Sequence, residues 1–151
     1  MQIPNAGFQI VNNVFRDAEL EPIRQELERY KLPVTRGGLR QADKKLLSVQ
    51  QIAISEMVIS LAQSLLTKKP RLIRAILFCK NTHNNWRVSW HQDKTVCVTE
   101  KFDCHGWGPW SVKENLPHVQ PPLEVLQHMV SIRIHLDDTD ETNGCLRVLP
   151  A

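Results

Sequence analysis

The residues best suited to chemistry lie in a short stretch of polar and aromatic sequence, Trp90-His91-Gln92-Asp93. Side chains two residues apart in a β-strand point to one face of the sheet, so a strand here would place the His91 imidazole beside the Asp93 carboxylate. These are two of the three protein ligands in the His-His-carboxylate site that binds non-haem Fe(II). The spacing alone is a weak signal, because roughly one random sequence in four of this composition contains such a pair. A structural hydrogen bond between the two side chains therefore stays open as the alternative.

A second group of polar residues alternates with apolar ones between residues 129 and 136. Apolar residues occupy the even positions from Val130 to Leu136, and polar residues, Arg133 among them, stand between them. In a strand, this alternation gives one apolar and one polar face. The polar face is either exposed to solvent or the wall of a cavity, where Arg133 could pair with a carboxylate ligand. Lys80, which follows another predicted strand, is a weaker candidate for the same role, since a single lysine there is more often solvated.

Two kinds of element are expected to carry these residues. Up to residue 70, apolar residues recur at spacings of three and four, which predicts amphipathic helices over residues 20–30 and 55–65. Ser55 is placed to begin the second helix, and Ser48 with Gln51 resembles a capping box. From residue 71 the pattern is typical of strands instead. These strands are expected at residues 73–78, 88–98, 129–136 and 145–149, with a short earlier one at 8–11.

The arrangement predicts an α+β protein that is mainly β with N-terminal helices. Residues 1–70 would form a helical support region and residues 71–151 the first part of a β-structure, all in one domain.

A segment rich in Gly, Pro and Trp separates the second and third of the predicted main strands, over residues 100–122. Long connections without regular structure are uncommon in compact domains and often act as lids or binding loops. This segment is the expected substrate-side loop, although tryptophans and prolines in a long loop more often simply fix it to the core. The candidate contact residues in it are Trp107, Trp110, His118 and Gln120.

Composition and charge exclude several classes of protein. Apolar residues make up 42% of the chain and charged residues 23%, which argues against a disordered polymer. No run approaches the ~18 apolar residues of a membrane span, and the N-terminus does not resemble a signal peptide. The net charge of +3 is too small and too scattered to indicate nucleic-acid binding. The four cysteines form no close pair, so reduced thiols are expected, in a soluble intracellular and by default cytoplasmic protein.

Several motifs taken in order resemble the phytanoyl-CoA dioxygenase family. Trp90-His91-Gln92-Asp93 is followed by GPWSVK at 108–113, PHVQPP at 117–122 and NGCLRVLP at 143–150. The resemblance runs from about Arg71 to the end, with weaker support from the helices. It implies a double-stranded β-helix, a jelly-roll or cupin-like fold, in which Fe(II) and 2-oxoglutarate drive oxidation by O₂. His91 and Asp93 match the two proximal iron ligands of the family, and Arg133 and Lys80 become candidates for holding a carboxylate of 2-oxoglutarate or of the substrate.

The resemblance also implies residues that the 151 positions do not include. In this family a second iron-binding His, and then an Arg that holds the far carboxylate of 2-oxoglutarate, come downstream of the NGCLRVLP segment. The chain is therefore expected to be an N-terminal portion of the enzyme, with a β-helix that is incomplete at its C-terminus.

The expected activity is hydroxylation of a small organic or lipid-like molecule with O₂ as co-substrate, without a nucleic-acid partner. A carboxylate at Asp93 favours hydroxylation, because related halogenases have a small residue there that leaves room for chloride. The alternative is a non-catalytic truncated paralogue that acts as a binding protein or has no function. A cupin-like metal-binding protein without 2-oxoglutarate chemistry is a third reading, less favoured by the NGCLRVLP segment.

Overall fold

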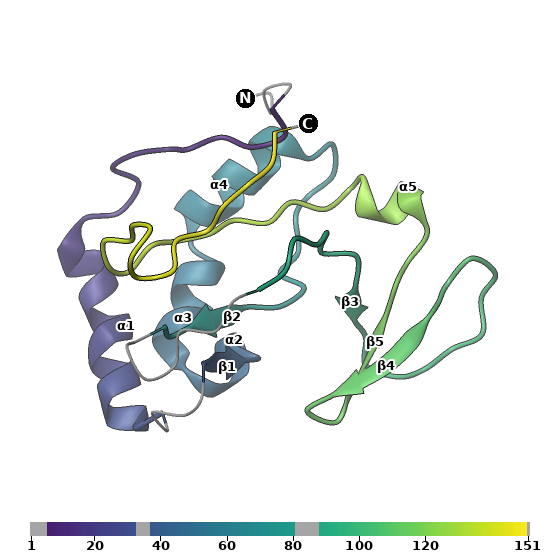
Figure 1. Cartoon of the computed structure of the whole chain (residues 1–151), viewed down its shortest axis with the longest axis horizontal. Helices are drawn as coiled ribbons and strands as arrows, with labels where there is room; N and C mark the ends of the chain where they lie inside the picture. The colour runs from purple at the N-terminus through teal and green to yellow at the C-terminus, as the bar shows by residue number, and fades with distance from the viewer. Residues whose placement is uncertain (1–5, 33–36, 81–87, 151) are drawn as a thin grey trace. The chain divides into compact units, whose positions relative to one another are not determined.

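The computed structural model describes residues 6–32, 37–80 and 88–150 of the 151-residue chain (Figure 1). The chain divides into two compact units. One comprises Met1–Arg87 together with Ile132–Ala151, and the other is Val88–Ser131. Each unit is described by itself below.

Helix α1, Asp17–Tyr30, opens the larger unit and confirms the predicted first helix, three residues longer at its start. Its N-cap is Arg16. The backbone N–H of Arg16 donates to the Glu19 carboxylate at 2.9 Å, which closes a capping box and holds the pKa of Glu19 below its ordinary value. The buried face of the helix carries Leu20 and Ile23.

Three short helices follow: α2 (Ala42–Lys45), α3 (Leu47–Ala53) and α4 (Glu56–Leu65). The predicted cap at Ser55 is confirmed, because its hydroxyl oxygen accepts a hydrogen bond from the Val58 N–H at 3.4 Å. The predicted capping box of Ser48 and Gln51 is wrong, since Ser48 lies inside α3. The free N–H groups at the start of α3 are satisfied instead by a side chain from α1, that of Glu26.

A two-stranded antiparallel sheet completes the framework of this unit. Strand β1, Gly38–Arg40, pairs with β2, Ile76–Phe78, so the predicted strand at 73–78 forms over its last three residues. Gly38 lies opposite Phe78, and a Cβ atom at this position would stand 2.3 Å from the Leu77 carbonyl oxygen. Only glycine therefore allows the two strands to approach this closely.

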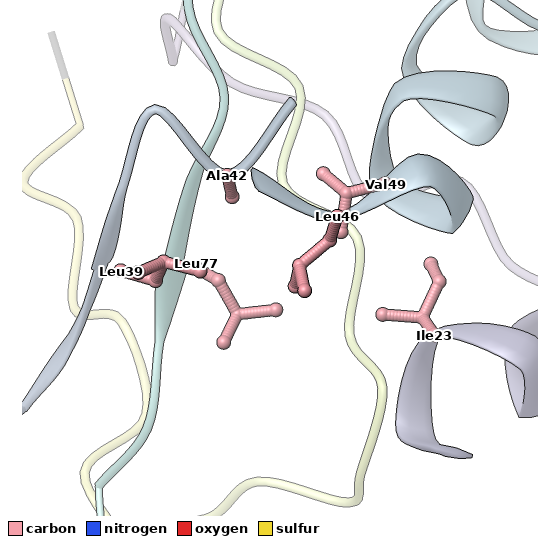
Figure 2. Close-up of a cluster of buried hydrophobic side chains, with 6 residues drawn as sticks. All are labelled: Ile23, Leu39, Ala42, Leu46, Val49 and Leu77. Atoms are coloured by element: carbon pink, nitrogen blue, oxygen red, sulfur yellow. The ribbon is translucent and has the colours of Figure 1, made fainter. Parts of the chain in front are cut away.

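The core of the larger unit lies between this sheet and the helices. Figure 2 shows the buried side chains converging on the space between the paired strands and α1. Complete burial of a leucine such as Leu46, which is 1% exposed, contributes about 2 kcal/mol. The cluster consists of Ile23, Leu39, Ala42, Leu46, Val49 and Leu77.

The smaller unit is built on a three-stranded antiparallel sheet in the order β3-β5-β4. Its strands are β3 (Val96–Cys97), β4 (Trp110–Lys113) and β5 (Leu116–Val119), and helix α5 (Leu123–Leu126) follows them. The expectation of a structureless loop over 100–122 is wrong, because β4 and β5 form a hairpin inside it. Glu114 and Asn115 both have positive φ, 48° and 62°, as a two-residue type I′ turn requires.

Several predicted strands are absent from the described residues. The strand at 88–98 is reduced to Val96–Cys97, and residues 8–11, 129–136 and 145–149 are not in strands. A strand persists only where a neighbouring segment satisfies its backbone groups, and alternating sequence cannot specify that neighbour. The described part of the chain is therefore mixed helix with small antiparallel sheets and has no closed barrel. None of its helices is long and apolar enough to cross a membrane.

Candidate functional site

His91 and Asp93 lie in the smaller unit, on exposed chain before β3 rather than on the expected strand. Nδ1 of His91 is 2.8 Å from the carbonyl oxygen of Ser89. A carbonyl can only accept, so Nδ1–H donates this hydrogen bond, and in the neutral ring Nε2 is then the nitrogen with a lone pair. Nε2 in turn is 3.8 Å from Oδ1 of Asp93. The two side chains that the sequence pairs are thus side by side, although no strand holds them.

The separation of 3.8 Å distinguishes between two roles of the pair. It is too long for a hydrogen bond, so the structural His–Asp hydrogen bond that the sequence left open is not formed. Two ligands of one ion with bonds of about 2.1 Å must lie within about 4.2 Å of each other, and the pair meets this condition. The ring arrangement also fits, because a metal-binding histidine usually donates its other N–H to a carbonyl or carboxylate.

The donor types therefore suit Fe(II), but their number does not complete a site. Within residues 6–32, 37–80 and 88–150, no group of three or more His, Cys, Asp or Glu side chains is placed to hold a metal ion. The pair supplies two of the three protein ligands of a facial site.

The two candidate cations for a carboxylate, Lys80 and Arg133, lie in the larger unit. Lys80 comes two residues after β2 and is half-buried, and Arg133 is exposed. Burial, together with the negative charge of Asp137, raises the pKa of the neighbouring Cys79 thiol. The proposed iron ligands and the proposed carboxylate-binding residues thus belong to different units.

The aromatic residues of the predicted substrate-side loop pack together within the smaller unit. Phe102 meets the rings of Trp107 and Trp110 edge to face, with centroids 5.0 Å and 5.2 Å apart. Nζ of Lys101 lies 5.8 Å from the Trp110 ring centroid, a cation–π distance. Both tryptophans are half-buried, so each ring is partly engaged by its neighbours and partly accessible.

The other two candidates in this segment are His118, whose side chain is buried, and Gln120, whose backbone forms hydrogen bonds. His118 is buried in the central strand β5, with Nδ1 3.1 Å from the Leu116 carbonyl oxygen. Gln120 pairs through its backbone, accepting from the Gly108 N–H at 2.9 Å and donating to the Pro109 carbonyl at 3.3 Å. These contacts hold the base of the hairpin together.

Two groups important to the site were not identified from the sequence. The Ser89 carbonyl fixes the His91 tautomer, but a backbone oxygen leaves no trace in residue types. Arg24 of α1 binds the segment that leads to Asp137, across 112 positions of sequence. Arg24 borders the apolar face of α1, four residues after Leu20, but this spacing does not identify its distant partner.

Comparison with known proteins places the chain in a family. A search of curated proteins and a search of solved structures each found no match. The model of the phytanoyl-CoA dioxygenase family matches residues 4–151, which includes the helical region where the sequence resemblance was weaker. The chain therefore belongs to the phytanoyl-CoA dioxygenase family.

Proposed function

We propose that this protein is an Fe(II)- and 2-oxoglutarate-dependent dioxygenase that hydroxylates a small organic or lipid-like substrate. Membership of the family supports an enzyme of the dioxygenase type. The observation that supports specific iron ligands is the geometry of His91 and Asp93. Nδ1 of His91 is hydrogen-bonded to the Ser89 carbonyl, and Nε2 lies 3.8 Å from Oδ1 of Asp93.

His91 and Asp93 are the proposed iron ligands. When bound, iron with 2-oxoglutarate supplies the oxidising power that inserts one oxygen atom of O₂ into substrate. In the neutral ring, the hydrogen bond from Nδ1–H to Ser89 leaves Nε2 as the nitrogen that can bind a metal, and the Asp93 carboxylate would contribute negative charge to hold a divalent cation. In the family, a histidine that follows the NGCLRVLP segment is the expected third ligand.

Arg133 and Lys80 are the proposed partners of a carboxylate of 2-oxoglutarate. A guanidinium can hold a carboxylate through two parallel hydrogen bonds, and an ammonium adds a compact positive charge. We also propose that residues 71 onward contribute to a double-stranded β-helix, with the N-terminal helices as its support.

The hairpin of β4 and β5 is the proposed substrate-side element. Trp107, Trp110 and Gln120 are the proposed contact residues, because both indole rings remain half-buried rather than fully enclosed. The burial of His118 favours a supporting role within β5 for this residue.

The proposal is tested by succinate formation from 2-oxoglutarate in a chain that extends to the downstream histidine of the family. His91→Ala and Asp93→Ala should each lower turnover at least a hundredfold, because a facial site has no spare protein ligand. The matched control is His105→Ala, an exposed histidine of the same unit. Undiminished turnover in either ligand variant would refute the assignment.

A second candidate, a non-catalytic member of the family that binds small molecules, is favoured by one observation. The described residues bring together two metal-binding side chains rather than three. Two ligands hold Fe(II) more weakly than three, so the 151-residue chain should bind the ion weakly and release no succinate. Weak binding here combined with turnover in the extended chain supports the enzyme, and absence of turnover in both supports the binding protein.

A further inference from the structure

Three aromatic side chains of the smaller unit form one cluster beside the hairpin of β4 and β5. Phe102 contacts both indole rings, and the planes of Trp107 and Trp110 stand at 73° and 84° to its own. Adjacent rings set at steep angles form a corner, in which one small group can contact two of them at once. The cluster is not closed over, because Phe102 is 37% exposed and both tryptophans are half-buried.

The backbone around the cluster holds the two tryptophans in place. Trp110 is paired with Val119 of the central strand β5, and that valine is fully buried. Between the two tryptophans, the Gly108 N–H donates to the Gln120 carbonyl oxygen at 2.9 Å. The aromatic surface is therefore preformed, so a ligand that binds there loses little affinity to the ordering of the protein.

Lys101 shows which kind of group these rings attract. Its Nζ lies 5.8 Å from the Trp110 ring centroid, within the distance at which the negative face of an indole attracts a cation. Two carboxylates flank the lysine in sequence, those of Glu100 and Asp103. Among the residues that the structure describes, no carboxylate forms an ion pair with Lys101. Its ammonium therefore lies over the ring rather than against an acidic neighbour.

The charges beside the cluster favour a cation over an anion as its ligand. From Glu100 to Asp103, two carboxylates accompany one ammonium, and all of these side chains are exposed. A cation that displaced the Lys101 ammonium from the ring would still be attracted by the carboxylates. An anion would meet the negative ring faces and the acidic side chains together.

We propose that the cluster of Phe102, Trp107 and Trp110 is a binding site for an organic cation, and that the substrate carries an alkylammonium group. The inference rests on the proposed function, in which the two tryptophans contact the substrate. In the free protein the Lys101 ammonium covers the Trp110 ring, and the ligand displaces it. Aromatic rings are suited to quaternary ammonium groups, whose charge attracts them to the ring faces.

Choline is the test ligand, because it presents a trimethylammonium group and no other charge. The comparison ligand is its neutral isostere, the alcohol in which a tert-butyl group replaces the trimethylammonium group. Each is titrated against the 151-residue chain at constant ionic strength, and the indole N–H signals of Trp107 and Trp110 are followed by NMR. We expect choline to shift both signals and to bind about tenfold more tightly than the alcohol, because only choline gains the cation–π attraction.

Lys101→Met removes the internal competitor, so this variant should bind choline about threefold more tightly than wild type. Unfolding cannot produce such a gain in affinity. Lys113→Met is the matched control, because it removes the same charge from an exposed position of β4, and it should bind choline as wild type does. Trp110→Leu should lose most of the binding. If Trp110→Leu unfolds, the alcohol and the two lysine variants still decide the question.

Three results would overturn the cation site. They are indole signals that choline leaves unshifted, an alcohol that binds as tightly as choline, and a Lys101→Met variant that binds choline no better than Lys113→Met. Failure of the proposed function is a separate outcome. If choline does not bind but the extended chain releases succinate, only the inferred substrate class is wrong. If choline binds but the extended chain releases no succinate, the cation site stands and its role in substrate recognition by an enzyme fails.

Discussion

At the scale of single residues, protonation is set by near neighbours that the sequence does not identify. The Ser89 carbonyl oxygen accepts a hydrogen bond from Nδ1–H of His91, and Nε2 of the same ring lies 3.8 Å from Oδ1 of Asp93. In the larger unit, Cys79 is affected in a different way. Burial and the charge of Asp137 both disfavour its thiolate, so its pKa is raised. The first pair is the proposed cation site, and the surroundings of Cys79 disfavour its reactive thiolate form.

The environment of Cys79 predicts its reactivity. At pH 8, Cys79 should react with iodoacetamide about tenfold more slowly than the exposed Cys104, because the thiolate is the reactive form and burial hinders access. Asp137→Asn should speed the Cys79 reaction by removing the nearby negative charge. Mass spectrometry of timed digests measures both rates. Equal rates for the two cysteines would show that Cys79 is not shielded as described.

At the scale of elements, contacts between distant segments decide which predicted elements form. Helix α3 begins where the Glu26 carboxylate of α1 accepts the N–H groups of Leu47 and Ser48, at 2.9 Å and 2.8 Å. The Ser48 hydroxyl also donates to this carboxylate, and these bonds lower the pKa of Glu26. One helix thus caps the next.

Glu26→Gln should lower the free energy of unfolding by about 1 kcal/mol at pH 7, the usual effect of losing a helix cap. Because the folded-state pKa of Glu26 is lowered, the stabilisation is fully present above the unfolded value of about 4.3 and is lost as pH falls through the folded value. The difference between wild type and variant should therefore shrink on acidification. Urea unfolding at several pH values measures it, with Glu28→Gln as the control on the same helix. A difference that stays constant down to pH 2 would contradict the capping role.

The elements predicted best are those whose signals are local. Helix α1 was predicted from the spacing of its apolar residues. The N-cap of α4 was predicted from Ser55 alone, the residue directly before that helix. The strands at 129–136 and 145–149 failed, since alternation indicates which side chains favour burial but not which segment supplies hydrogen bonds. The hairpin of β4 and β5 was missed because Glu114 and Asn115 are not the usual Asn-Gly pair of a type I′ turn.

At the scale of the whole molecule, family membership and site geometry support the same reading from separate observations. The order of the motifs from Trp90 to Pro150 predicted the family, and the match over residues 4–151 confirms it. His91 and Asp93 were predicted to lie side by side because a strand would point both to one face. No strand forms there, and the two side chains are nevertheless 3.8 Å apart on irregular chain. The roles of Arg133, Lys80 and the hairpin residues stay predictions.

The most direct test of the central claim is where a divalent ion binds on this chain. Mn(II), a redox-stable substitute for Fe(II), should broaden the NMR signals of residues 89–94 first. The broadening should disappear in His91→Ala and in Asp93→Ala and persist in His105→Ala. If Mn(II) broadens another region, or broadens 89–94 equally in the two ligand variants, His91 and Asp93 are not the iron ligands.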